Sequence, residues 1–412
     1  MPPFSTTPPS TVSVLRNVRP WGGEAVDLHV ADGRITQVTP HVPAGAAASG
    51  SGTPAPGEVD GRGLLALPGF VNAHAHVDKS WWGKPWVSYG GEATTQGRIA
   101  HEREHRDELG IPGVDVTVAV LREFLRHGTT AIRTHVDVDL GLGLRGIDVV
   151  RESLFVLGGA VDAEIVAFPQ DGVLRRPGVL DLLDAAAAAG AEHIGGLDPA
   201  SIDRDPVTQL DGLFEIAERR GVGVDVHLHD GGELGAFQIE LMIERTVRAG
   251  LQGKVNVAHG FAVGQLPATR MADLVEAMGD AGISMTTVAP IGATPLPLDL
   301  LREHGVRVGL GTDGIRDLWA PYGTGDLLAL TTRLAQLARF RYDEDLVRAA
   351  RLATSDAGFF VGHDVHDLVV GSRADVVLVD AENTQDAVVR APARALVVAA
   401  GQVVARDGEV LV

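Results

Sequence analysis

The chain has 412 residues, of which 45% are hydrophobic and 22% charged, as is typical of a soluble globular protein with an ample core. Its formal net charge of −19 argues against nucleic acids and anionic membrane surfaces as partners, because such partners select basic patches. The absence of cysteine excludes disulfides, thiol nucleophiles and the zinc deaminase design that uses cysteine ligands.

The start of the chain has no basic segment followed by an apolar one, so we expect no signal peptide. No run of about 18 apolar residues is present to span a bilayer. We therefore expect a cytoplasmic protein that acts on a small molecule, and the sequence leaves homo-oligomer formation open.

Residues from Thr11 to about Pro40 alternate in short β-like runs, with a turn at Asp32-Gly33. From Leu64 onward, short apolar runs alternate with longer amphipathic stretches. The predicted strands are Leu67–His74, Thr130–Val136, Glu164–Pro169, Glu192–Gly196, Val222–His227, Val255–His259, Ser284–Val288 and Val306–Gly311. Helices predicted between them include Val114–Arg126, Val179–Ala189, Gln209–Arg220, Gly235–Ala249 and Ala268–Ala281. Strand and helix alternating in this way predict an α/β fold, a parallel (β/α)8 TIM barrel.

Two further helical stretches, Asp326–Phe340 and Asp345–Ala357, follow the last predicted strand. From Ser372 the hydrophobic period returns to two, as in a strand. We expect the two β-rich ends, residues 11–63 and 367–412, to pair into a small second domain beside a barrel of residues 64–366.

The predicted strands end on residues that can bind a metal. Catalytic side chains of a (β/α)8 barrel lie at the carboxyl ends of its strands. Strand one ends on His74 and His76, whose i, i+2 spacing directs both imidazoles to one face. Strands five and six end on His227 and His259, and Asp313 follows strand eight. Imidazole and carboxylate are ligands that zinc or ferrous iron accepts, so the pattern predicts a metal site.

Two other groups of histidines are less distinctive. His101 and His105 lie one helical turn apart among charged residues, which is typical of a solvated helix face. His135 ends strand two, where it could support the site, face the substrate or pack in the core.

Six motifs together give the chain a family resemblance: PGFVNAHAHVD, RTHVDVD, VAFPQDG, DVHLHD, VAHG and GTDGIRDLWAPYGTG. From about Thr11 to the C-terminus the chain resembles the amidohydrolase superfamily, specifically its bacterial cytosine deaminase branch. The resemblance implies a (β/α)8 barrel joined to a β-sandwich built from both ends of the chain.

The same resemblance implies one divalent metal ion, Zn²⁺ or alternatively Fe²⁺, held by His74, His76, His227 and Asp313. It implies that His259 hydrogen-bonds the attacking water and that Asp313 acts as its base. Members with two metals bridge them with a lysine at the end of strand four, where this chain has GGLDPA, so a mononuclear site is favoured.

Substrate contacts also follow from the resemblance. It implies that Gln170 faces the amide-like edge of a heterocycle and that Trp319 packs beside the ring. Asp198 is a further candidate contact, with a structural role in a turn as the alternative.

One position departs from the family pattern. The deaminases carry glutamate three residues after the strand-five histidine, and here that position is Asp230. We expect Asp230 to be the proton shuttle, with His229 or Glu233 as alternatives, and the shorter carboxylate argues against cytosine itself. The predicted activity is hydrolysis of a C–N bond, deaminating a small nitrogen heterocycle. The alternatives are hydrolysis of a cyclic amide and, more remotely, a non-catalytic scaffold.

Overall fold

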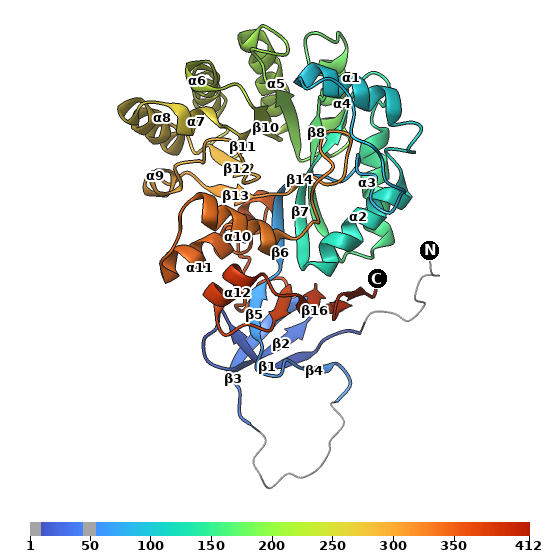
Figure 1. The fold of residues 1–412 in the computed structure, drawn as a ribbon, viewed down its shortest axis with the longest axis vertical. Coiled ribbons are helices and arrows are strands. Elements are labelled where there is room, and N and C mark those ends of the chain that lie inside the picture. The colour runs from blue at the N-terminus through green and yellow to red at the C-terminus, as the bar shows by residue number, and fades with distance from the viewer. Residues whose placement is uncertain (1–9, 44–54) are drawn as a thin grey trace.

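A computed structural model describes residues 10–43 and 55–412 of the chain. It contains a curled parallel sheet surrounded by helices and a second, mixed sheet formed by the two ends of the chain (Figure 1). The first nine residues, on which the expectation about a signal peptide rests, lie outside the described part. Within the described ranges, no helix is long and apolar enough to cross a membrane.

The curled sheet has nine strands, and all of its pairs are parallel. They are β6 (Phe70–His76), β7 (Thr129–Asp137), β8 (Asp162–Phe168), β9 (His193–Leu197), β10 (Gly223–Leu228), β11 (Val255–His259), β12 (Ser284–Thr287), β13 (Val308–Leu310) and β14 (Asp313–Gly314). Their order is β13-β12-β11-β10-β9-β8-β7-β6-β14. Each of the eight predicted strands overlaps one strand of this sheet.

Most helices lie around the outside of the curled sheet (Figure 1). The helices are α1 (Thr95–His105), α2 (Val114–Arg126), α3 (Arg145–Val156), α4 (Val179–Ala188), α5 (Pro206–Arg220), α6 (Gly232–Ala249), α7 (Ala262–Gln265), α8 (Ala268–Asp280), α9 (Leu298–Glu303), α10 (Leu327–Leu337), α11 (Asp343–Arg351), the 3-10 helix η1 (Asp356–Val361) and α12 (Thr384–Arg390). Of these, η1 contacts strands β6, β7, β8 and β13, and α12 packs on α10 and α11 beside the second sheet. A continuous core of Val, Leu, Ile and Ala side chains fills the space between the helices and the sheet.

Helix α5 illustrates how local sequence sets these boundaries. The Asp205 carboxylate accepts a hydrogen bond from the Thr208 backbone N–H, and Pro206 occupies the first turn, where its missing N–H costs nothing. Gly221 ends the helix with φ of 74°, a left-handed conformation that glycine adopts without strain. We therefore attribute both ends of α5 to its own capping residues.

The first and last strands of the curled sheet meet at its carboxyl edge. β14 begins three residues after β13 ends, and it pairs with β6, so that Asp313 lies opposite Ala75. Gly311 makes this approach possible, because a Cβ atom there would lie 2.5 Å from the His74 backbone nitrogen. Strand pairing therefore brings Asp313 beside the histidines of β6.

The second sheet joins both ends of the chain in the order β18-β17-β16-β15-β5-β1-β2-β3, with β4 paired to β1. Its strands are β1 (Val14–Pro20), β2 (Val26–Ala31), β3 (Arg34–Pro40), β4 (Glu58–Asp60), β5 (Leu65–Pro68), β15 (Val376–Val379), β16 (Arg394–Ala399), β17 (Gln402–Arg406) and β18 (Glu409–Val410). The prediction of one strand over Leu67–His74 was wrong, because β5 pairs with β15 of the second sheet and only β6 enters the curled sheet.

Candidate active site

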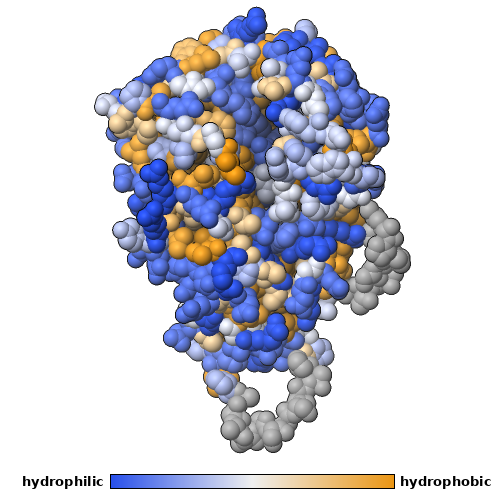
Figure 2. Space-filling view, viewed as in Figure 1, coloured by the Kyte–Doolittle hydropathy of each residue, from blue (hydrophilic) through white to orange (hydrophobic). Residues whose placement is uncertain are grey.

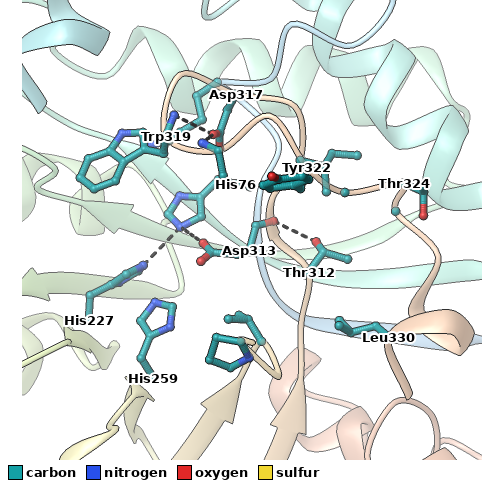
Figure 3. Close-up of a pocket in the computed structure, with 18 of the residues that line it drawn as sticks. His76, His227, His259, Thr312, Asp313, Asp317, Trp319, Tyr322, Thr324 and Leu330 are labelled. Carbon is teal, nitrogen blue, oxygen red and sulfur yellow. Dashed lines mark hydrogen bonds and ion pairs between the residues drawn. The ribbon is translucent and has the colours of Figure 1, made fainter. Parts of the chain in front are cut away.

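Side chains from β6, β10, β11 and β14 converge at the carboxyl edge of the curled sheet (Figure 3). The Nε2 atoms of His76 and His227 are 3.2 Å apart. An Asp313 carboxylate oxygen lies 3.3 Å from Nε2 of His76 and 3.6 Å from Nε2 of His74. His259 completes the group, with one ligand atom within 4.8 Å of those of His74 and Asp313. The structure thus brings together the five residues expected around the metal.

The donor set of this cluster fits a metal ion. Both ring nitrogens of His74, and Nδ1 of His76, His227 and His259, are buried without a hydrogen-bond partner among the described residues. Unpartnered buried nitrogens cost free energy, which a bound cation would offset. Burial also lowers the pKa of His76 and His227 well below the ordinary value, which favours the neutral form that binds metals.

His135 lies against the cluster, with a ring nitrogen within 4.8 Å of ligand atoms of His74, His76 and His227. It is fully buried, with ring centroids 4.2 Å from His74 and 4.6 Å from His227. Its Nε2 is 3.3 Å from a carboxylate oxygen of buried Asp225, which also accepts a hydrogen bond from Asn256. Burial, reinforced by His74, lowers the pKa of His135 to about 4. The close packing and the Asp225 contact favour a supporting role over contact with substrate.

Three residues of the site hold a strained backbone. Asp198, His259 and Asp313 have φ angles of 33°, 67° and 62°, in the left-handed region that non-glycine residues rarely occupy. Such conformations cost about 1–3 kcal/mol each and gather at functional sites, where the surrounding structure enforces them. The three residues hold this conformation directly after β9, at the end of β11 and at the start of β14, where it sets the direction of their side chains.

A cavity of about 540 Å³ opens above the cluster. Figure 2 shows the face of the molecule hollowed near its centre. Four of the five cluster residues line this cavity, and His74 lies beneath it. The predicted substrate contacts Gln170 and Trp319 also line it, so six predicted residues share one cavity: His76, Gln170, His227, His259, Asp313 and Trp319.

Lys79 lines the same cavity and is only 4% exposed. Its Nζ donates to Asp137 and to the Gln170 side-chain oxygen, each at 2.7 Å, and lies 3.7 Å from Glu102. Burial alone would lower the pKa of Lys79, but the charges of Asp137 and Glu102 outweigh burial and raise it. Lys79 therefore stays protonated and presents an ammonium group near His76 of the histidine cluster.

Three buried carboxylates, those of Asp78, Glu102 and Asp137, surround the single ammonium group of Lys79. Asp78 accepts a hydrogen bond of 2.9 Å from the Asp137 backbone N–H, and burial together with Asp137 raises the pKa of Asp78 to about 7. Burial also raises the pKa of Asp137 well above its ordinary value. Lys79 contacts Asp137 and Glu102 directly, so its ammonium group offsets the cost of burying these two carboxylates.

The surroundings of Gln170 and Trp319 refine their predicted roles. The Gln170 oxygen is occupied by Lys79, which leaves the side-chain NH2 donors for a ligand. The Trp319 indole N–H donates to Glu102, and its ring packs with Phe168 and Leu197. Trp319 is thus fixed as an apolar wall of the cavity.

His229 and Asp198 form a hydrogen-bonded pair at the cavity edge. Nδ1 of His229 lies 2.9 Å from Asp198, which also accepts a bond from the His229 backbone N–H. The His229 ring lines the cavity and stacks on His259 with centroids 4.4 Å apart. Burial alone would lower the pKa of His229, but the bond to Asp198 and its charge raise it. Asp198 is 2% exposed, so it orients His229 and lies outside the cavity lining.

Asp230 and Glu233, the other two candidate proton shuttles, lie outside the cavity lining. The Asp230 carboxylate accepts bonds from the Ser201 backbone N–H at 3.3 Å and from the Gln238 side chain at 3.0 Å. Glu233 is mostly exposed and pairs with Arg270. Neither residue lines the cavity, so the geometry favours His229 among the three candidate proton shuttles.

Sequence reasoning missed several residues of the cavity. Lys79 follows His76 by three residues, and that spacing in HAHVDKS was the available signal. Asp317 also lines the cavity, where burial raises its pKa to about 6. Tyr322 and Arg333 line the cavity as well, and their side-chain types carried no signal.

A profile of the amidohydrolase family matches residues 117–405. Together with the fold and the histidine cluster, this match shows that the chain belongs to the amidohydrolase family.

Three relatives sharpen this assignment. The crystal structure of N-isopropylammelide isopropylaminohydrolase from Burkholderia multivorans superposes with a TM-score of 0.89 and 41% identity, covering 96% of this chain and 99% of that one. N-isopropylammelide isopropyl amidohydrolase of Pseudomonas sp. strain ADP is 28% identical over 86% of this chain and 89% of its own length. The fold also resembles 5-methylcytosine deaminase from Klebsiella pneumoniae, with a TM-score of 0.80 and 23% identity over 95% and 97% of the two chains. These relatives support a hydrolase of C–N bonds.

Proposed function

We propose that this chain is a metal-dependent hydrolase that removes an amine or ammonia from a small nitrogen heterocycle. The observation that carries the proposal is the convergence of His74, His76, His227 and Asp313 on the floor of the cavity. We further propose a (β/α)8 barrel over residues 64–366 and a β-sandwich of residues 11–63 plus 367–412.

The four converging residues would hold one divalent ion, Zn²⁺ or alternatively Fe²⁺. When bound, such an ion lowers the pKa of water and polarises the substrate. Asp313 accepts the proton of the attacking water, because its carboxylate faces the cavity beside His76. His259, from the opposite side, donates a hydrogen bond to the oxygen on which negative charge develops.

His229 is the proposed proton donor to the leaving nitrogen. It lines the cavity beside His259, and Asp198 fixes its ring through Nδ1, which leaves Nε2 for the substrate. A histidine held by a carboxylate in this way is a common general acid. Asp230, which the sequence favoured, is bonded to Ser201 and Gln238 instead.

The substrate we propose carries oxygen on the ring edge opposite its leaving amine. Lys79 and the Gln170 NH2 group both offer donors there, which suit oxo groups better than a donor-rich amino edge. Trp319 offers a flat apolar face for the ring. The similarity to enzymes named for N-isopropylammelide supports an alkylamino-substituted, oxygenated triazine or pyrimidine rather than cytosine.

A substrate panel tests this function. The zinc-loaded protein is incubated with N-isopropylammelide, cytosine, aminopyrimidines, pterins and hydantoins, and free amine, ammonia and ring products are quantified. We expect amine release from alkylamino oxo-heterocycles with the greatest kcat/KM. Ring opening of hydantoins without amine release would contradict the proposal and favour a cyclic amide hydrolase.

Replacement of His229 by Gln is expected to lower kcat by about 10²–10⁴-fold, the range that general acid catalysis contributes, without loss of the metal. Asp230→Asn, which changes the neighbouring residue outside the cavity, serves as the matched control and should retain kcat within about tenfold. Steady-state kinetics and metal analysis of both variants give the answer. A Asp230→Asn variant that is inactive while His229→Gln turns over normally would reverse the assignment.

A further inference from the structure

The cavity extends beyond the cluster of His76, His227, His259 and Asp313. Tyr322, Thr324 and Leu330 lie on the side of Asp313 away from Trp319 and His227 (Figure 3). Val288 and Pro290 add further apolar wall, so this extension can hold more than a bare ring. A ring held between Trp319 and Gln170 would direct a substituent at its reacting carbon into this extension.

Helix α10 forms one wall of the extension. Ala329, Leu330 and Arg333 line the cavity, and their i, i+1 and i+4 positions place Ala329 and Arg333 one turn apart on the same helix face. Arg333 therefore adds a guanidinium group beside the apolar Ala329 and Leu330, while Asp326, which also lines the cavity, is paired with Arg394.

Arg333 makes no side-chain hydrogen bond and no ion pair with any residue of the ranges 10–43 and 55–412. It is half-buried, and burial lowers the pKa of its side chain without a compensating acid. The situation contrasts with Arg394, the other cation near this end of α10, which pairs with Asp326. In a chain of net charge −19, a half-buried arginine facing the main cavity without a partner is available for an anion from solution.

We propose that Arg333 binds a carboxylate at the end of the amine substituent of the substrate. This inference rests on the proposed function and names its substrate class: oxygenated heterocycles that carry a carboxyalkylamino group. Hydrolysis breaks the bond between the ring carbon and the amine nitrogen. Water supplies the oxygen that stays on the ring and the hydrogens that complete the ring hydroxyl and the amine, so a small amino acid leaves.

A carboxylate fits this end of the cavity better than a phosphate. One planar guanidinium matches the two oxygens of one carboxylate, and the surrounding Leu330, Ala329 and Tyr322 offer no second cation. The apolar wall between Asp313 and Arg333 suits the methylene groups that join the nitrogen to the acid.

The test uses the zinc-loaded full-length protein and matched triazines: ammelides bearing N-carboxyalkyl groups of one to four methylenes, and the carboxamide of each. Both kcat/KM and the dissociation constant, by calorimetry, are measured for each pair. In the wild type we expect the best carboxylate to exceed its carboxamide by about 10- to 100-fold, the usual strength of a charge-assisted hydrogen bond.

Arg333→Met is expected to bring the carboxylate-to-carboxamide ratio close to one, and Arg333→Lys, which keeps the charge but loses the planar fork, to give an intermediate ratio. Gln336→Met, on an exposed position of the same helix, is the control and should retain the wild-type ratio. A wild type without preference, or an unchanged ratio in Arg333→Met, overturns the inference. If no compound is hydrolysed but binding still depends on Arg333, the proposed function fails and the carboxylate site stands.

Discussion

The double variant His74→Ala/His76→Ala is expected to lose its divalent ion and at least about 10³-fold in kcat/KM. Both imidazoles come from one strand and lie within 4 Å of the Asp313 carboxylate, so their removal takes away half of the proposed ligand set. A Lewis acid supplies several kcal/mol of transition-state stabilisation, and each 1.4 kcal/mol corresponds to about tenfold in rate. Elemental analysis and steady-state kinetics on the purified protein measure the two effects separately.

A second histidine pair provides the matched control. The rings of His101 and His105 contact one another on α1, with centroids 4.3 Å apart, and lie outside the groups of residues that could hold a metal ion. His101→Ala/His105→Ala should therefore retain one equivalent of metal per chain. Full metal content in His74→Ala/His76→Ala, or two equivalents in the wild type, would rule out the mononuclear site.

Replacing Lys79 by Met is expected to destabilise the fold by about 3–5 kcal/mol, the usual effect of removing one partner from a buried ion pair. The variant leaves Asp137 and Glu102 buried without the ammonium that contacts them at 2.7 and 3.7 Å. The effect would be measured as the shift in the midpoint of urea unfolding, with metal-loaded protein in both cases.

Lys84→Met is the control for this loss. Lys84 pairs with Asp115 at 2.6 Å, but its side chain is 36% exposed, so we expect a change below about 1 kcal/mol. The loss of unfolding free energy in Lys79→Met should also become smaller as the pH falls from 8 to 6. A buried acid whose pKa is raised by folding binds more protons in the folded state, so a fall in pH stabilises the folded state. Asp78, with a pKa of about 7, already behaves in this way. Equal unfolding midpoints for Lys79→Met and wild type would contradict the role given to Lys79.

Strand periodicity predicted most of the curled sheet, because each buried parallel strand is a short apolar run with a polar end. It failed where Leu65–Pro68 and Phe70–His76 form one apolar stretch that serves two sheets. The strand pattern also predicted the cluster of His74, His76 and Asp313, because a side chain at the end of a strand has both its place on the sheet edge and its direction set by the strand.

Other parts of the site depend on contacts that no local pattern encodes. Asp198 and His229 are 31 residues apart, and their pairing became visible only from the adjacent ends of β9 and β10. Asp230 seemed the better shuttle because the family pattern points to a carboxylate there, yet its side chain turns to Gln238. Arg333 stands in an ordinary amphipathic helix, so only the three-dimensional structure shows that it faces the cavity.

The pairing of β6 with β14 makes completion of the site depend on the last strand of the curled sheet. Asn72 and Thr312 are 240 residues apart in the chain, yet they exchange two hydrogen bonds, at 2.8 and 3.0 Å, beside His74 and Asp313. Contacts between such distant residues carry a large loop-closure entropy and form late in folding. During synthesis, the histidines of β6 must therefore wait for all the other strands of the curled sheet before Asp313, at the start of β14, emerges. If the proposed metal site forms, capture of the ion by all four ligands would report that the curled sheet has closed through β14.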